Sequence, residues 1–200
     1  PARGRLLLLI ADHHILTELW RLVTSINCTR NTSATIAGPA LSCLSQFRHL
    51  WAIDFEYTQQ DGDPPSPHCV VVRELRTGRV IRQWLGDDGA ETNLFFDLAD
   101  DDLVVAFYAS AEISCFKVLG WPEPRNILDL FVEFRNATNG VSTPCGSGLL
   151  GALAYYGLGA MDGAEKAEMR DLALRGGPYT AEERRDLLDY CQQDVDALAG

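Results

Sequence analysis

The chain has 200 residues, 46% of them hydrophobic, which is enough to bury one sizeable core and suits one α/β domain better than two. Its formal net charge of −11 argues against a protein that holds nucleic acid by a broad basic surface, because such binding needs many lysines and arginines near phosphates. A nuclease is not excluded, since carboxylates that hold divalent metals add negative charge themselves.

The apolar runs and the cysteines indicate in which cellular compartment the protein is expected. The run at 6–11 is far shorter than the roughly 20 residues needed to cross a bilayer, and charged residues flank it. The six cysteines include no C-x-x-C pair, so a zinc-ribbon spacing is absent and reduced thiols are expected. We therefore expect a cytoplasmic protein without a membrane span.

Residues 1–46 differ in composition from the rest of the chain. A short apolar run is followed by a helix-like stretch at 16–23 and by a segment rich in Ser, Thr and Asn. We expect an N-terminal appendage of uncertain structure here, and one main domain over residues 47–200. The chain begins at Pro1 and ends at Gly200, just after a helical pattern, as a piece of a longer protein would.

Three strands are predicted at the start of the main domain. The segment HLWAIDFEY is a buried strand that ends near Tyr57, because the following QQDGDPPSP is rich in turn residues. The segments CVVVREL and RVIRQWL are separated by Arg76, Thr77 and Gly78, which is typical of a short hairpin with glycine at the turn. The three strands should therefore form an antiparallel meander.

Strands and helices alternate in the second half of the chain. The segment DLVVAFYA predicts a fourth strand, and AEISCFKVLGW has the 3.6-residue apolar period of a helix. NILDLF predicts a fifth strand and GLLGALAYYGL a buried helix, and Thr180 with Glu183 forms a capping box that opens the helix TAEERRDLLDYCQQDVDALA. This order predicts an α/β protein with a mixed five-stranded sheet, its first three strands antiparallel and its faces flanked by helices, which fits the ribonuclease H-like fold.

Two acidic residues share one face of the first strand. Asp54 and Glu56 lie two positions apart, so their side chains point to the same side. Two buried carboxylates repel each other unless a positive group lies between them, and a divalent metal is the usual one. A pair of solvated acids at a strand end is the alternative, since a D-x-E triplet is common by chance.

Further candidates lie after the fourth strand and in the last helix. Glu112 stands near the carboxyl-end crevice where α/β folds bind ligands, although an acid that compensates a helix N-terminus is the alternative. Tyr190 and Asp194 are four apart and share a helical face, which could instead be an ordinary amphipathic surface. Asp189, Asp194 and Asp196 crowd a turn near the helix C-terminus, where acids are unfavourable, and this indicates a role other than stability.

Together these motifs resemble the DEDDy-type 3′→5′ exonucleases, which include the proofreading domain of DNA polymerase I and ribonuclease D. The first motif appears as AIDFEYT and the last as DYCQQDVDAL, in the family's order. The middle motif departs from the pattern, because VVAFYASAE places Glu112 where the family has an aspartate. YASAEISCF and ILDLFVEFRN look most like a phage or prophage polymerase-associated branch, and the resemblance covers about Trp51 to Leu198.

The resemblance implies two-metal phosphodiester hydrolysis at 3′ ends. It implies that Asp54 bridges two Mg²⁺ or Mn²⁺ ions, since hard oxygen ligands select such ions and no His/Cys cluster favours zinc. Glu56 and Asp194 would complete the site for the ion that activates water. Glu112 would hold the second ion, and Tyr190 would orient the nucleophile.

The resemblance also bears on partners and on one further acid. Asp129 matches an acid of the family near the fifth strand, with a capping role as the alternative. His68 has no partner histidine at metal-ligand spacing and is expected at the surface. The expected substrate is a single-stranded 3′ end, of DNA in the first place with RNA as the alternative, and a polymerase domain in the same or another chain is an expected partner. An inactive ribonuclease H-like module that binds nucleic acid or a polymerase is the competing interpretation, because of the altered middle motif.

Overall fold

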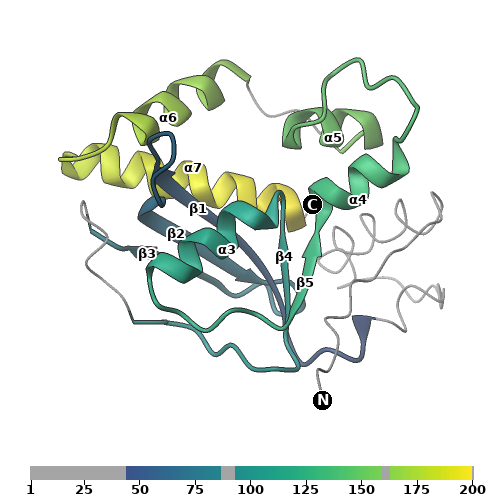
Figure 1. Cartoon of the computed structure of the whole chain (residues 1–200), viewed down its shortest axis with the longest axis horizontal. Coiled ribbons are helices and arrows are strands. Elements are labelled where there is room, and N and C mark those ends of the chain that lie inside the picture. The colour runs from purple at the N-terminus through teal and green to yellow at the C-terminus, as the bar shows by residue number, and fades with distance from the viewer. Residues whose placement is uncertain (1–43, 87–92, 159–162, 200) are drawn as a thin grey trace.

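The computed structural model describes residues 44–86, 93–158 and 163–199, without the side chains of 163–166. The helix-like stretch predicted at 16–23 lies outside the described residues, as does nearly all of the predicted appendage. Ten elements are described (Figure 1). The strands are β1 Leu50–Thr58, β2 Ser66–Glu74, β3 Val80–Trp84, β4 Leu103–Ala106 and β5 Asn126–Asp129; the helices are α3 Ala109–Val118, α4 Leu130–Ala137, α5 Leu149–Tyr156, α6 Gly163–Arg175 and α7 Ala181–Ala199.

The five strands form one mixed sheet in the order β3-β2-β1-β4-β5. The β1–β2 and β2–β3 pairs are antiparallel, and the β1–β4 and β4–β5 pairs are parallel. The prediction of a five-stranded α/β sheet with an antiparallel first half is confirmed, and its order is that of a ribonuclease H-like fold. The β2–β3 hairpin turns at Gly78, whose φ of 74° suits glycine and whose amide donates to the carbonyl of Glu74 at 2.8 Å.

The two faces of the sheet bury separate apolar cores. One core packs under α3 and includes Trp51, Ile53 and Phe55 of β1. The other core packs under α7 and includes Leu50 and Ala52 of the same strand. Helices therefore cover both faces, as the sequence predicted, with α3 and α7 on opposite sides of the sheet (Figure 1).

The last helix begins where its sequence predicts. The side chain of Thr180 accepts from the amide of Glu183 at 3.2 Å, and the carboxylate of Glu183 accepts from the amide of Thr180 at 2.8 Å. This reciprocal pair is the predicted capping box, and it fixes the register in which α7 crosses the sheet.

The fifth strand is shorter than predicted, because Asp129 ends it. The Asp129 carboxylate accepts from the amides of Phe131 at 3.0 Å and Val132 at 3.3 Å, which caps a helix, α4, that the apolar pattern of NILDLF did not predict. His68 is also placed differently from its prediction: it is 1% exposed, lies 2.5 Å by Nε2 from the hydroxyl of Thr58 and packs edge-on against the ring of Tyr179.

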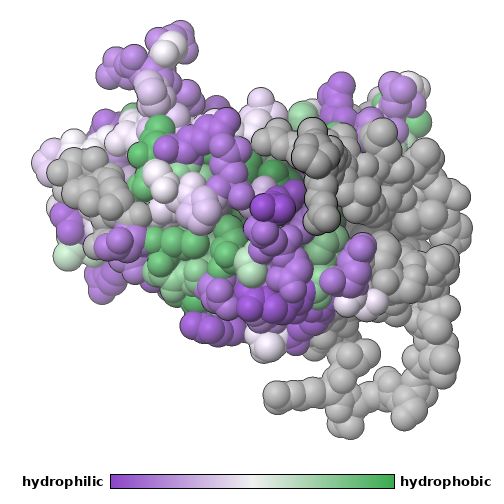
Figure 2. Space-filling view, turned by 60° about the horizontal axis from the view of Figure 1, so that its bottom comes forward, coloured by the Kyte–Doolittle hydropathy of each residue, from purple (hydrophilic) through white to green (hydrophobic). Residues whose placement is uncertain are grey.

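The outer surface of the described chain is mixed in character. On the coloured surface of Figure 2, hydrophobic patches are interrupted by hydrophilic side chains. Across the described ranges, none of the helices combines the length and the apolar character that a bilayer span requires.

Candidate metal centre

The first two carboxylates lie where β1 extends beyond its parallel neighbour. The strand β4 pairs with β1 only from Leu50 to Ala52, so Asp54 and Glu56 lie past the carboxyl end of β4. Strand alternation turns both side chains towards α7, on the face that carries Leu50 and Ala52. Asp54 is partly buried and Glu56 is 9% exposed, so the pair is not a solvated strand end.

Helix α7 brings a second set of side chains to the same place. Tyr190 and Asp194 are 7% and 8% exposed, and the Tyr190 hydroxyl is hydrogen-bonded to the Asp194 carboxylate. Between them, the fully buried thiol of Cys191 donates to the backbone carbonyl of Asp54 at 3.2 Å. That bond fixes this turn of α7 against β1. The helical face shared by Asp194 and Tyr190 therefore supplies both a carboxylate and a phenol to this place.

Glu112 completes the group from the first turn of α3. Its side chain is 4% exposed, and it accepts a hydrogen bond from the backbone amide of Phe55. The second carboxylate oxygen, Oε2, is buried and has no hydrogen-bond partner within the described structure. Burying a carboxylate oxygen without a hydrogen-bond partner lowers the stability of the fold, unless a cation or a proton is bound there.

The electrostatics show how closely these acids approach one another. Burial raises the pKa of Glu56, and the negative charges of Asp54, Asp194 and Glu112 raise it further. Burial likewise raises the pKa of Glu112, followed by the charge of Asp54, while the amide of Phe55 acts in the opposite direction. Every charge named in these two shifts is negative, so the arrangement is complementary to a cation.

The ligand atoms of one subset are close enough to share a single ion. Atoms of Asp54, Glu56 and Cys191 all lie within 4.8 Å of one another. The carboxylates provide the hard oxygen donors that Mg²⁺ and Mn²⁺ prefer, whereas the thiol is a soft donor already bonded to a carbonyl. The residues present therefore fit a hard divalent cation.

Asp129 has the structural role that was its alternative interpretation. Besides capping α4, its carboxylate accepts from the amides of Tyr108 at 3.1 Å and Ala109 at 3.0 Å. Both oxygens are thus used by backbone donors at the starts of α3 and α4. Asp129 holds the turn that delivers Glu112. The sequence offered capping as the alternative role, but it could not show that the four amides come from two separate segments.

The crowding of aspartates near the end of α7 has two different explanations. Asp189 pairs with Arg82 at 2.5 Å, and Asp196 pairs with Arg73 at 2.7 Å. These two acids tie α7 to β3 and β2, so the expectation that they do something other than stabilise is wrong for them. Only Asp194 of the three turns into the acidic group. Cys191 was not singled out by the sequence analysis, although it lies within the last motif.

Comparisons with known proteins give structural neighbours only. No family model matches the chain, and no curated protein matches it. The EXO domain of Nibbler from Aedes aegypti is 15% identical, with a TM-score of 0.45, over 80% of this chain and 89% of that one. Ribonuclease D of Trypanosoma brucei, solved in complex with the RNA U12, is 16% identical, with a TM-score of 0.48, over 96% of this chain and 61% of that one. The fold assignment rests on the strand order and pairing described above.

Proposed function

We propose that the chain is a metal-dependent 3′→5′ exonuclease acting on single-stranded nucleic acid. One observation carries the proposal: four acids from three separate elements converge on one largely buried place, and a buried oxygen among them lacks a hydrogen-bond partner. Structural acids are usually satisfied by arginines or amides, as Asp129 and Asp196 are. The four acids are Asp54, Glu56, Glu112 and Asp194.

The proposed metal ligands are these same four carboxylates. The charge of Asp54 is the largest charge effect on the pKa of both Glu56 and Glu112, so we assign Asp54 as the carboxylate that two ions would share. When bound, two Mg²⁺ or Mn²⁺ ions would supply water activation and charge neutralisation at the attacking and leaving oxygens.

The chain's own residues orient the reacting groups. Burial, followed by the charges of Asp194, Glu56 and Asp54, raises the pKa of Tyr190 above its ordinary value, so its hydroxyl keeps its proton at neutral pH. Tyr190 is therefore a hydrogen-bonding group that positions water or the terminal phosphate, and not a base. Cys191 keeps α7 in register with β1.

The finer assignment concerns the substrate. Single-stranded DNA, with a polymerase domain in the same or another chain as partner, is favoured by the resemblance of the middle segments to polymerase-associated exonucleases. RNA is the alternative within the same chemistry, because recognition of the sugar depends on contacts to the 2′-hydroxyl.

Digestion of end-labelled oligonucleotides tests the proposal. With Mg²⁺ or Mn²⁺, 5′-labelled single strands should shorten stepwise from the 3′ end and release mononucleotides, and EDTA should stop the reaction. Parallel DNA and RNA strands of the same sequence separate the two substrates. An absence of metal-dependent shortening with either strand would reject the exonuclease proposal.

The second candidate is a catalytically inactive module that binds nucleic acid or a polymerase. It is favoured by one observation, the glutamate at position 112 where the family has an aspartate. Glutamate is one methylene longer, and octahedral Mg²⁺ tolerates little displacement of a ligand. If the wild type is active, Glu112→Gln should reduce cleavage severely; if it is inactive yet binds metal by calorimetry, Glu112→Asp should restore cleavage.

A further inference from the structure

Helix α7 brings a sulfur atom to the acidic group, besides a carboxylate and a phenol. The thiol of Cys191 is fully buried, and its sulfur lies within 4.8 Å of a carboxylate oxygen of Asp54 and of one of Glu56. In a tetrahedral zinc site, sulfur and oxygen ligands are about 3.5 Å apart, because the metal–ligand bonds are roughly 2.0–2.3 Å long. Small side-chain rotations therefore bring these three ligand atoms within reach of one ion.

A second buried thiol adjoins the first. Cys69 of β2 is the sheet partner of Glu56, and the thiols of Cys69 and Cys191 are hydrogen-bonded to each other. Both side chains are 0% exposed. If Cys191 gives up its proton to a metal ion, the Cys69 thiol can donate to the resulting thiolate. Donors of this kind orient metal ligands and strengthen their binding.

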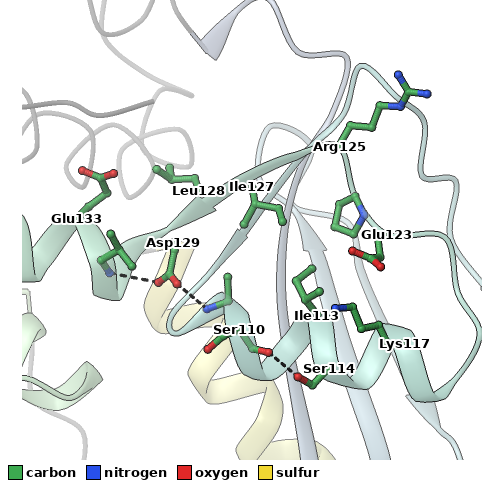
Figure 3. Close-up of a pocket in the computed structure, with 13 residues that line it drawn as sticks. Ser110, Ile113, Ser114, Lys117, Glu123, Arg125, Ile127, Leu128, Asp129 and Glu133 are labelled. Atoms are coloured by element: carbon green, nitrogen blue, oxygen red, sulfur yellow. Dashed lines mark hydrogen bonds between the residues drawn. The ribbon is translucent and has the colours of Figure 1, made fainter. Parts of the chain in front are cut away.

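The acidic group also has a carboxylate oxygen that the described residues do not compensate. Glu112 is 4% exposed, and its Oε2 has no hydrogen-bond partner among them. The acids around the cavity between α3 and β5 differ in this respect: Figure 3 shows Glu123 beside Lys117, and Asp129 is bonded to backbone amides. An uncompensated buried carboxylate and a buried sulfur thus occur together in the group at α7.

The sulfur atom widens the range of ions that this centre can bind. Mg²⁺ takes oxygen ligands in octahedral geometry and gains little from sulfur. Thiolates favour Zn²⁺ and its heavier relative Cd²⁺, and Zn²⁺ accepts a tetrahedral shell that one sulfur, two carboxylates and a water complete. Asp54 is partly exposed whereas Cys191 is fully buried, so an ion reaches the sulfur by way of the carboxylates.

We propose that Cys191, Asp54 and Glu56 form a site for a thiophilic divalent cation such as Zn²⁺, which binds the Cys191 sulfur and excludes Mg²⁺ from the centre. On binding, the thiol proton passes to water, and a metal–sulfur bond replaces the hydrogen bond to the Asp54 carbonyl. Nothing is oxidised or reduced. The exclusion of Mg²⁺ rests on the proposed function, because the two ions share Asp54 and Glu56; the binding of the thiophilic ion does not.

Cd²⁺ is the probe for the test, because a cadmium–thiolate bond has an ultraviolet charge-transfer band that cadmium–oxygen bonds lack. Cd²⁺ is titrated into the full chain, kept reduced by a phosphine, with the exposed Cys145 replaced by serine throughout. The band should grow with the first equivalent and be lost in Cys191→Ser, whose hydroxyl can still donate to the Asp54 carbonyl. It should persist in Cys69→Ala, with Cd²⁺ affinity about tenfold weaker, the usual loss for a group that supports a ligand.

Cys115→Ser is the matched control, because Cys115 is also fully buried but belongs to the core on the α3 side of the sheet. It should keep the band. Melting curves establish that each variant folds, and Cys191→Ala takes the place of the serine variant if that one does not. No band in the wild type, or an equal band in Cys191→Ser, overturns the inference whether or not the chain cleaves DNA. A band without any Mg²⁺-dependent cleavage counts against the proposed function alone.

Discussion

The two faces of strand β1 start alike and end differently. On the α3 side, Trp51, Ile53 and Phe55 are all at most 3% exposed, so the face is apolar to its end. On the α7 side, Leu50 and Ala52 are equally buried, and the next two positions are Asp54 and Glu56. The apolar pattern continues to the end of one face, but the other face becomes acidic. Buried acids in place of apolar residues do not stabilise the fold by themselves, so they indicate a ligand-binding site.

The aromatic side chains on the α3 side of β1 make favourable contacts that the acidic side chains on the α7 side do not make. Phe116 of α3 lies 5.9 Å from Phe55 and 5.3 Å from Trp121, ring centre to ring centre, and all three rings are almost fully buried. Such contacts are favourable without any ligand. Across the strand, the neighbouring acids raise one another's pKa, which is favourable only when a cation or protons are bound.

The largest expected effect comes from removing the acid at the centre of the acidic face. Asp54→Asn should lower exonuclease turnover by on the order of 10³-fold or more, as loss of a group that acts directly on developing charge does. It should also raise the melting temperature of the metal-free protein, because one of several repelling charges is gone. Asp61→Asn, at an exposed loop position just beyond β1, is the matched control and should change neither quantity. Wild-type turnover in Asp54→Asn would place the active centre elsewhere.

On the aromatic face the opposite pattern is expected. Phe116→Ala should reduce the free energy of unfolding by about 3–5 kcal/mol, the usual loss for a buried phenylalanine, without a specific loss of metal affinity. Urea denaturation measures the first quantity and calorimetry the second. Phe116→Leu, which leaves a smaller cavity, keeps the comparison usable if the alanine variant does not fold. A selective loss of metal binding in the leucine variant would show that the two faces are not independent.

Much of the fold could be predicted from local patterns. The β2–β3 hairpin can be predicted because Gly78 marks its turn, and the last helix can be predicted because Thr180 and Glu183 form its cap. The helix after β5 could not be predicted from the sequence, because Asp129 ends the strand by capping backbone amides within a continuous apolar run. From the amino-acid sequence alone, an acid that caps a helix cannot be distinguished from an acid that binds a metal.

The sequence predicted the acidic group only as separate pairs of residues, each pair on one strand or one helix. Spacing showed that Asp54 and Glu56 share a face, as do Tyr190 and Asp194, but it could not show that α7 crosses the sheet beside β1. That arrangement depends on contacts more than a hundred residues apart, such as Cys191 with Asp54 and Arg73 with Asp196. No local period encodes such contacts.

A smaller effect should appear in the pH dependence of stability without metal. Glu56 and Glu112 have raised pKa values in the folded protein, so the folded state holds their protons more tightly than the unfolded state. Stability should therefore fall as pH rises above the ordinary value of 4.5, by about 1.4 kcal/mol per pH unit for each such group until its folded pKa is passed.

Melting curves in EDTA and in Mg²⁺ measure this effect. The melting temperature in EDTA should drop as pH rises above the ordinary glutamate value of 4.5, Mg²⁺ should remove most of the drop, and Glu112→Gln should flatten the EDTA curve. Asp102 does not interfere: although burial opposes it, hydrogen bonds from Arg48 and Ala99 lower its pKa, so its contribution is lost only as pH falls below about 4. A flat EDTA curve for the wild type would mean that the acids are not strained without metal.

The smallest effect is expected at Tyr190, which borders the acidic face without being a proposed ligand. Its hydroxyl is bonded to Asp194 and keeps its proton, so Tyr190→Phe removes one oriented hydrogen bond and leaves all four carboxylates in place. We expect turnover to fall about 10- to 100-fold through poorer positioning of the reacting groups, with unchanged Mg²⁺ affinity by calorimetry and unchanged binding of the oligonucleotide. The hydroxyl also limits where the Asp194 carboxylate can point, and a structural role of that kind would show as weaker metal binding. Equal turnover in the phenylalanine and wild-type proteins would remove the phenol from the mechanism, whereas a loss of metal affinity would make Tyr190 a positioning residue for the ligand Asp194 and extend the acidic face by one residue along α7.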